Sequence, residues 1–561
     1  MDLRKLLLLA FVLSGMAALV YELTWIRPLQ FLLGSTTYTI SIIFAAFMAG
    51  LGLGSWIISK YVDRISNLPK AYALMELGIG LYGVFLLIIF NILPDIYRII
   101  YPLHQSFYVF EFVQFLLVFI VLLIPTTLMG ATFPIVAKFY TKEKIGKGVG
   151  EIYSANNLGA IIGSFSAGFI LIPLLGIKWS IVFAGSINLL LGFVILSYTT
   201  KKSFKKIIAL VLILFLFLAI VYAGSYNIQK LYSGGFSRTV IPKQIMEKTE
   251  FLFYEEGLYG TVAVIINPLD DAISLLIDGK GQGSVAIKDL RVNYLLSYLP
   301  LLLNPKADNA LVIGLGTGAT SGHLANLVKT TTVEIEPKIL EASKYFTVSN
   351  SNVLENQNHD FIITDARNYL LKTETKYDVI AQQTSDPWQS FSTNLFSKEY
   401  FELVDEHLNE DGLYLDWVPI YTMTPDDFRS FYKTFNSVFP NVIVFANLKG
   451  NEEIPFNPQT GELVFVGSKK KIAYEDKINE NFDLLPSYAK GILRMIWIDS
   501  SDDLLNLFMF TNEDMAGYAA DAELITDDNL KLEFSTARSF LVGSSSEIIS
   551  DINKFLKKDV E

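Results

Sequence analysis

Long apolar runs dominate the first two fifths of the chain. Each of seven runs approaches or exceeds the roughly 20 residues that a helix needs to cross a bilayer. The first run is too long, and too closely followed by the next, for a cleaved signal peptide. The pattern therefore predicts a polytopic bundle of about seven transmembrane helices, at residues 6–26, 36–59, 71–93, 110–137, 152–175, 179–198 and 207–223.

The pattern changes after this block. Short stretches of alternating apolar and polar residues at 259–266 and 272–277 predict the strands of a small β-rich unit. The order then becomes strand, glycine-rich loop, helix and strand, which is typical of a Rossmann-like α/β domain. We therefore expect three parts: a polytopic transmembrane domain at 1–226, a small β-rich part at 227–308 and a Rossmann-like domain at 309–561.

Composition and charge support this division. Apolar residues make up 52% of the chain and charged residues 18%, which excludes a wholly soluble or disordered protein. Residues 1–226 carry 16 Lys/Arg and 8 Asp/Glu, whereas the remainder has a net charge of −19. An acidic second part argues against nucleic acid as a partner. The chain has no cysteine and only four scattered histidines, so we expect no disulfide, no thiolate nucleophile and no metal site.

Three consecutive predicted strands end in residues that suit a nucleoside. The first runs into Gly314-Leu-Gly-Thr-Gly318, whose glycines would let the backbone approach a ligand. Glu334 closes the second strand, where a carboxylate can accept hydrogen bonds from ribose hydroxyls, and Asp365 closes the third, where an acid can hold an adenine amino group. The glycine spacing alone also fits a dinucleotide, but the three strand ends together favour an S-adenosylmethionine-type site over a nicotinamide site.

The motifs of the second part occur in the order seen in spermidine synthases. The whole chain resembles the membrane-fused spermidine synthase-like family, in which a major-facilitator-like helical block precedes an aminopropyltransferase-like domain. Residues 54–64 are similar to a facilitator loop, and residues 525–534 to the end of the fused family. The synthase motifs are Leu276-Ile-Asp-Gly-Lys-Gly-Gln282, Val312-Ile-Gly-Leu-Gly-Thr-Gly318, Val333-Glu-Ile-Glu-Pro337, Thr364-Asp-Ala-Arg-Asn-Tyr369, Ser385-Asp-Pro-Trp388 and Asn394-Leu-Phe-Ser-Lys-Glu-Tyr-Phe401.

The resemblance implies roles for twelve residues. On the nucleoside side, Gln282 would contact the amino-acid tail, Gly314, Gly316 and Gly318 would pass beneath it, Glu334 would bind the ribose, and Asp365 with Ala366 would lie at the adenine. The catalytic positions fall on Asp386 and Gln383, and the remaining substrate positions on Thr317, Tyr259 and Trp388. The resemblance implies no tightly bound cofactor, with S-adenosylmethionine or its decarboxylated form as co-substrate.

The chain departs from spermidine synthases on the acceptor side. Thr317 stands where those enzymes have an acid facing the transferred chain, and Gln383 stands where they have a carboxylate. A primary amine with a pKa near 10.4 has to lose a proton before it attacks the sulfonium-activated carbon, and glutamine is no base. Asp386 has two possible roles. It could hold or deprotonate the amine, or it could be a turn residue before a proline. Three family positions that usually hold His, Glu and Gln are occupied by Asn293, Tyr294 and Gly260.

Three functions stay open at this point. The leading one is transfer of an aminopropyl-type group to a small cationic amine, with Asp386 as the acceptor-side carboxylate. A methyl or other alkyl transferase acting on a membrane or exported acceptor would need no acid at Thr317. A non-catalytic sensor or transporter of polyamines or nucleosides would suit Gln383. The expected partners are the amine and the lipid bilayer, with a homodimer as an option and no nucleic acid.

Two arguments disagree on the side of the membrane that holds the second part. The N-terminus and the even-numbered loops carry 13 Lys/Arg against 3 in the odd-numbered loops, so the N-terminus is expected in the cytoplasm and seven spans would export the second part. S-adenosylmethionine is made in the cytoplasm, and we therefore expect a multi-pass protein of the cell (inner) membrane with a cytoplasmic second part. The run at 110–137, which contains Pro125, Gly130 and Pro134, would reconcile the two if it were re-entrant or crossed twice. The other reconciliation is an exported domain whose ligand arrives through the helical block.

Overall fold

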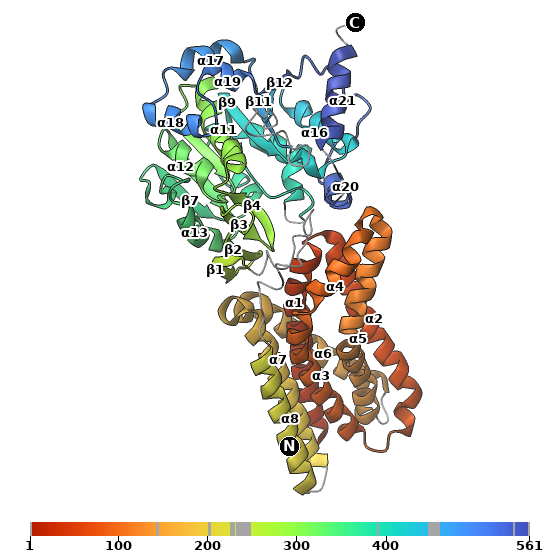
Figure 1. The fold of residues 1–561 in the computed structure, drawn as a ribbon. Coiled ribbons are helices and arrows are strands. Elements are labelled where there is room, and N and C mark those ends of the chain that lie inside the picture. Colours follow the sequence, from red (N-terminus) through yellow and green to blue (C-terminus); the bar gives the residue numbers. More distant parts are fainter. Residues whose placement is uncertain are drawn as a thin grey trace. The chain divides into compact units, whose positions relative to one another are not determined.

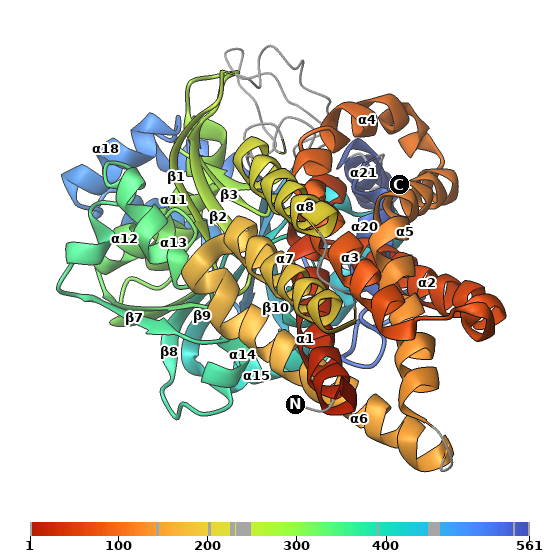
Figure 2. The same cartoon turned by 90° about the horizontal axis from the view of Figure 1, so that it is seen from below.

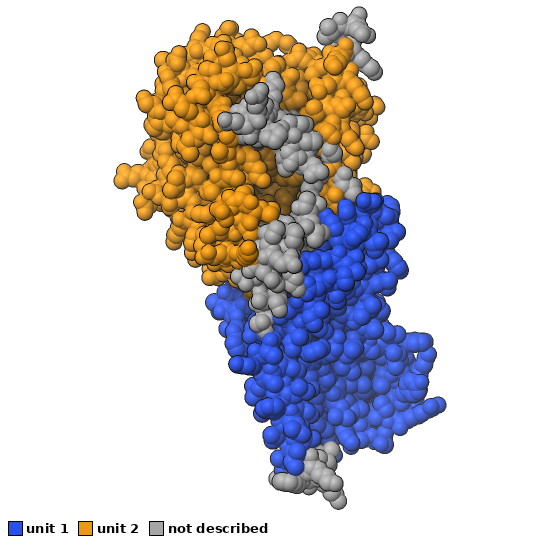
Figure 3. Space-filling view, viewed as in Figure 1, with its two compact units in different colours: residues 1–236, 240–247 blue, residues 237–239, 248–561 orange. Residues whose placement is uncertain are grey.

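The computed structural model describes residues 3–141, 145–199, 204–224, 231, 248–389, 392–446, 461–541, 543 and 545–558. The chain folds as two compact units (Figure 3). The first comprises residues 1–236 and 240–247, and the second residues 237–239 and 248–561. Each unit is described by itself below.

The first unit is built from helices (Figure 1). Among the residues that the structure describes, five segments are long and apolar enough to cross a membrane: Leu3–Leu33, Thr37–Arg64, Leu68–Phe90, Phe107–Tyr140 and Ile145–Thr199. The N-terminal helical block is therefore confirmed, while the number of seven spans stays a prediction. The helices are α1 (Leu3–Leu33), α2 (Thr37–Tyr61), α3 (Leu68–Phe90), α4 (Leu93–Ile100), α5 (Phe107–Tyr140), α6 (Ile145–Ser166), α7 (Ile172–Thr199) and α8 (Phe204–Ala223).

The predicted runs map onto these helices, and two features of the helices bear on the predicted topology. The runs at 152–175 and 179–198 fall within the single apolar segment Ile145–Thr199, which leaves helical geometry at Gly176, with φ 74° and ψ 172°. The run at 110–137 lies inside α5, which continues as one helix through both of its prolines. A break in this run, one of the two ways to reconcile the topology, is therefore absent from the structure.

Glycines let the helices of the first unit approach closely. A methyl group at Gly54 of α2 would lie 1.9 Å from the carbonyl oxygen of Thr127, and one at Gly130 of α5 would lie 2.0 Å from that of Leu51. On α6, a methyl group at Gly159 would lie 1.9 Å from the carbonyl oxygen of Val12 in α1. Backbones in contact leave no room for a side chain, so these small residues determine which helices pair. Figure 2 shows the same helices from below.

The second unit contains two sheets (Figure 1). The smaller is an antiparallel meander in the order β1-β2-β3-β4, formed by β1 (Glu250–Glu256), β2 (Thr261–Ile266), β3 (Ile273–Ile277) and β4 (Lys280–Ser284). The larger has eight strands in the order β12-β10-β11-β9-β8-β5-β6-β7. Its strands are β5 (Asn309–Ile313), β6 (Lys329–Glu334), β7 (His359–Ile363), β8 (Tyr377–Gln382), β9 (Leu408–Val418), β10 (Asn441–Ala446), β11 (Leu463–Ser468) and β12 (Phe508–Thr511).

Helices cover both faces of the larger sheet because its central strands are apolar on both sides. In β5, Leu311 and Ile313 belong to one core cluster and Ala310 and Val312 to the other, as the alternation of a strand requires. The helices of this unit are α11 (Ile287–Leu303), α12 (Ala319–Ala325), α13 (Lys338–Ser343), α14 (Ala366–Leu370), α15 (Lys398–Glu406), α16 (Pro425–Val438), α17 (Tyr474–Phe482), α18 (Ser487–Met495), α19 (Ser501–Leu505), α20 (Lys531–Ser539) and α21 (Ser545–Lys558). The expected Rossmann-like domain is confirmed.

The strand order determines where a ligand can bind. Strands β6 and β7 lie on one side of β5 and strands β8 and β9 on the other, and all five pair in parallel. The loops that follow β5 and β8 therefore leave in opposite directions. A crevice opens at such a point, at the carboxyl ends of the strands, and it is the usual ligand site of open α/β sheets.

Candidate active site

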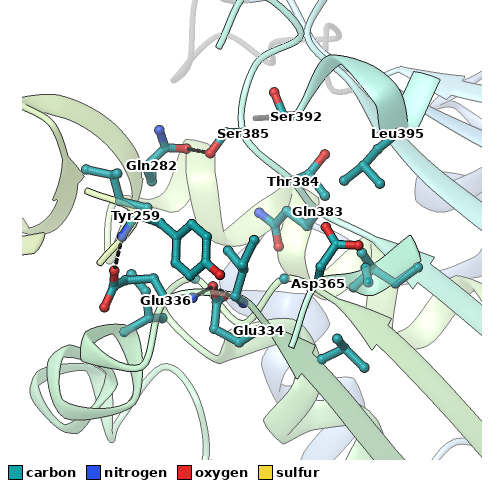
Figure 4. A pocket seen from close by; sticks show the side chains of 18 of the residues that line it. Tyr259, Gln282, Glu334, Glu336, Asp365, Gln383, Thr384, Ser385, Ser392 and Leu395 are labelled. Atoms are coloured by element: carbon teal, nitrogen blue, oxygen red, sulfur yellow. Dashed lines mark hydrogen bonds between the residues drawn. The ribbon is translucent and has the colours of Figure 1, made fainter. Parts of the chain in front are cut away.

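A cavity of about 950 Å³, counting the part open to solvent, lies at this switch point (Figure 4). Its wall comes from the loops after β5, β6, β7 and β8 and from the small sheet. Nine of the twelve residues singled out from the sequence line it: Tyr259, Gln282, Gly314, Gly316, Thr317, Glu334, Asp365, Ala366 and Gln383. Gly318, Asp386 and Trp388 are not part of the wall.

The loop after β5 requires its glycines. Gly314 and Gly316 have φ values of 87° and 55°, in the left-handed region that other residues avoid. A methyl group at Gly314 would lie 2.6 Å from the carbonyl oxygen of Gln383, whereas at Gly316 it would meet no atom within 4 Å. The loop therefore packs on the β8 end at Gly314 and presents bare backbone to the cavity at Gly316. Gly318 instead caps α12 behind the wall.

Glu334 is held in place by backbone amides. Its carboxylate accepts hydrogen bonds from the backbone N–H of Leu315 at 2.9 Å, of Ile335 at 2.8 Å and of Glu336 at 3.0 Å. Burial raises the pKa of Glu334, and these N–H donors oppose the rise. The side chain thus joins the glycine loop to the end of β6 and faces the cavity in one orientation.

Asp365 has a structural role as well as a place in the wall. It is the N-cap of α14, and its carboxylate accepts a hydrogen bond from the backbone N–H of Asn368 at 2.8 Å. Ala366, the first residue of this helix, lines the cavity beside it, together with Thr364 and Leu395. The combination of an acid and an apolar surface is suited to a heterocycle with an exocyclic amino group.

Glu336 is a carboxylate of the cavity wall that the sequence reasoning missed. It accepts hydrogen bonds from the backbone N–H of Tyr259 at 2.8 Å and of Lys338 at 2.9 Å, and so links β6 to the small sheet (Figure 4). A methyl group at Gly257 would lie 2.3 Å from its carboxyl carbon, so a larger residue there would displace the Glu336 carboxylate. The alternation Glu334-Ile-Glu336 after a strand was the available signal.

The acceptor-side positions in the wall are uncharged. Thr317 and Gln383 both line the cavity, and the hydroxyl of Thr320 lies 3.0 Å from the Gln383 carbonyl oxygen, to which it donates. Asn293 and Tyr294 lie in α11 outside the wall, where Asn293 donates to the backbone carbonyl of Asp289. The two wall positions at which spermidine synthases have acids therefore bring no negative charge here.

The loop after β8 is tied to strand β4. Ser385 donates to the Gln282 side-chain carbonyl oxygen at 3.2 Å (Figure 4). The Gln282 amide donates to the Gln389 side-chain oxygen at 3.2 Å. In the same loop Asp386 is fully buried, accepts a hydrogen bond from the Tyr421 hydroxyl at 2.9 Å and forms an ion pair with Lys280. Asp386 is thus close to the cavity without reaching it.

Comparisons with known proteins show what this chain is similar to. The spermine/spermidine synthase domain matches residues 290–449. The chain is similar to polyamine aminopropyltransferase 2 of Aquifex aeolicus, with 24% identity over 86% of this chain and 91% of the relative. It is also similar to the polyamine aminopropyltransferase of Corynebacterium efficiens, with 24% identity over 77% of this chain and 81% of the relative.

Two further matches cover a smaller share of the chain. The polyamine aminopropyltransferase of Methanocaldococcus jannaschii is 32% identical over 29% of this chain, which spans 56% of that relative. The crystal structure of spermidine synthase from Thermotoga maritima covers 44% of this chain and 88% of its own, with 18% identity and a TM-score of 0.37. In this chain, the region that matches the spermine/spermidine synthase domain follows an N-terminal helical block, and the two relatives that it resembles over most of their length are polyamine aminopropyltransferases.

Proposed function

We propose that the cavity binds decarboxylated S-adenosylmethionine, or S-adenosylmethionine itself, and that the enzyme transfers an aminopropyl-type group from it to an amine. The observation that carries the proposal is the convergence of Gly316, Glu334 and Asp365, from the ends of three parallel strands, on one cavity. Glu334 would bind the ribose hydroxyls and Asp365 the adenine amino group. Gln282, Gly314 and Ala366 would complete the nucleoside site, with Gly318 supporting the loop from behind.

The chemistry follows from the sulfonium. The amine nitrogen attacks the carbon next to sulfur, a new C–N bond forms as the C–S bond breaks, and the sulfur keeps the electron pair. The nitrogen has to be deprotonated for this attack, and neither Thr317 nor Gln383 can accept its proton. The amine would attack as the free base, with its proton passing to solvent. Asp386, which is buried outside the wall and paired with Lys280, is our proposed acceptor-side carboxylate, with Tyr259 and Trp388 on the substrate side.

A second function is supported by one specific observation. Thr317 and Gln383 are both neutral, so the cavity lacks two of the charges that would hold a diamine. An alkyl transfer to a nucleophile without a positive charge, such as methyl transfer to a membrane-embedded acceptor, needs neither charge. It would use the same nucleoside site.

Product analysis tests the two functions against each other. The purified full-length protein is incubated with either nucleoside and a panel of monoamines and diamines, and the products are identified by mass spectrometry. A mass gain of one aminopropyl group on an amine supports the proposal. Methylated products support the second function, and the absence of any product with both nucleosides contradicts both. Glu341→Ala, at an exposed residue outside the wall, is the control variant.

We propose further that the first unit spans the membrane and that the second unit works in the cytoplasm. The five long apolar segments support the first statement. The second rests on the place where S-adenosylmethionine is made.

A further inference from the structure

Lys280 occupies a position that the hairpin of β3 and β4 determines. The hairpin turns at Asp278 and Gly279, whose φ values of 48° and 80° are those of a two-residue type I′ turn. Asp278 also accepts a hydrogen bond from the backbone N–H of Thr261 at 2.8 Å, which ties the turn to β2. Lys280 pairs with Ile277 as the first residue of β4. The base of its side chain is therefore rigidly placed.

The contacts of Lys280 show that its side chain faces the loop after β8. Gln282 reaches the same loop, although the pairing of β3 with β4 shifts register between the pairs Leu275–Gly283 and Leu276–Gly281. Gln282 lines the cavity and bonds Ser385 and Gln389, and Lys280 forms its ion pair with Asp386, between those two residues. The contact is thus part of a continuous junction between β4 and the cavity wall.

The ammonium of Lys280 lies among groups that together suit a cation. Asp386 is fully buried, and its second carboxylate oxygen accepts a hydrogen bond from Tyr421. The centroid of the buried Trp388 ring lies 5.8 Å from the Lys280 nitrogen, within the range of a cation–π interaction. We call Asp386, Tyr421 and Trp388 the cation seat. The ion pair places the Lys280 ammonium in this seat, and only 14% of the Lys280 side chain is exposed to solvent. The cation that occupies the seat is therefore a side chain of the protein and not a ligand.

We propose that Lys280 is a specificity-determining residue that fills the cation seat and so excludes the second ammonium of a diamine. The acceptor would then be a monoamine, whose single nitrogen is the attacking one, rather than a small α,ω-diamine such as putrescine. This inference rests on the proposed function, because it concerns the acceptor side of the same cavity. The neutral Thr317 and Gln383 agree with it, since they also remove attraction for a dication.

The test compares putrescine with n-butylamine, which has the same carbon chain and one ammonium fewer. Both are titrated calorimetrically into the full-length protein saturated with 5′-methylthioadenosine. We expect Lys280→Met and Lys280→Gln to bind putrescine at least tenfold more tightly than the wild type, with a less than twofold change for n-butylamine. Lys280→Arg should behave as the wild type, and adding Asp386→Asn to Lys280→Met should abolish the gain.

A matched control is available in Lys469→Met. Lys469 is also partly buried, with 25% of its side chain exposed, and pairs with Asp405 away from the cavity, so its removal should leave putrescine binding unchanged. Equal putrescine affinity in both neutral Lys280 variants and the wild type would overturn the proposal. Failure of both neutral variants to fold would overturn it too, by making Lys280 only the counter-ion of a buried carboxylate.

The two proposals fail in different ways. If 5′-methylthioadenosine does not bind the wild type, the proposed function is wrong. The putrescine titrations of the wild type and the Lys280 variants are then carried out without nucleoside, and they still test the inference about Lys280. If the nucleoside binds all variants and the gain for putrescine is absent, only the inference about Lys280 is wrong.

Discussion

At Glu334 a single carboxylate both shapes the glycine loop and faces the cavity. It accepts three backbone hydrogen bonds, so its orientation is determined before any ligand binds. Preorganised acceptors of this kind lose little entropy when a ribose hydroxyl donates to them. The residue is therefore expected to matter more for affinity than its exposure suggests.

We expect Glu334→Ala to weaken the binding of S-adenosyl nucleosides by about 1.5–3 kcal/mol, the usual loss for a charged hydrogen-bond acceptor. Isothermal titration with 5′-methylthioadenosine measures the loss. Glu341→Ala should bind as the wild type does. Unchanged affinity in Glu334→Ala, with an unchanged melting temperature, would remove Glu334 from the nucleoside site.

A buried histidine makes the second unit sensitive to acid. His323 lies between the Tyr298 hydroxyl at 2.8 Å and the Ser349 carbonyl at 3.1 Å, and burial lowers its pKa to about 4. The unfolded chain has a histidine pKa near 6.5, so it binds more protons between these two values. Stability is then lost as the pH falls from about 6.5 toward 4, by about 3 kcal/mol for this group.

The pH prediction is checked by thermal unfolding of the wild type and of His323→Gln at pH 7.5 and pH 5. The wild type should lose more stability between the two conditions than the variant does. The difference between the proteins separates His323 from carboxylates that titrate in the same range. An equal loss in both would show that His323 does not contribute to acid sensitivity.

At the scale of elements, two glycines of the same helix provide a matched pair. A methyl group at Gly54 would collide with the Thr127 backbone of α5, whereas one at Gly52 would meet no atom within 4 Å. We expect Gly54→Ala to destabilise the helical unit by about 1–3 kcal/mol, the usual effect of overpacking. Gly52→Ala should be neutral or stabilising by up to about 1 kcal/mol, because alanine favours a helix.

Thermal denaturation of the full chain in detergent compares the two variants. A melting temperature of Gly54→Ala equal to that of Gly52→Ala would contradict the close contact between α2 and α5. The comparison is internal to one helix, so differences in hydrophobicity or in detergent binding cancel.

At the scale of the whole molecule, the side of the membrane is directly testable because the chain has no cysteine. Lys470 is exposed, with 58% of its side chain accessible, so a cysteine introduced there can be labelled. We expect a membrane-impermeant maleimide to leave Lys470→Cys unlabelled in intact cells and to label it after permeabilisation. Labelling of intact cells would place the second unit outside and support the count of 13 basic residues against 3.

Local patterns were sufficient for much of the fold and of the nucleoside site. The apolar runs, the glycine loop and the acids at the ends of successive strands are each defined by residues close together in the sequence, so they can be recognised without the tertiary structure. Gly316, Glu334 and Asp365 therefore line one cavity, as expected from strands that end at one edge of a parallel sheet. The run at 110–137 forms one helix, as its apolar length predicts, because prolines alone do not break a helix that packs along a neighbour.

By itself, the sequence determined the helical block, the Rossmann-like domain and the resemblance to spermidine synthases. The acceptor side was decided only by the tertiary structure. Lys280 and Asp386 lie far apart in the chain, and nothing near either residue predicts an ion pair; a hairpin and the loop after β8 bring them together. Asp386 is fully buried, and a buried carboxylate requires a charged partner because solvent does not reach it. In this protein that partner is Lys280.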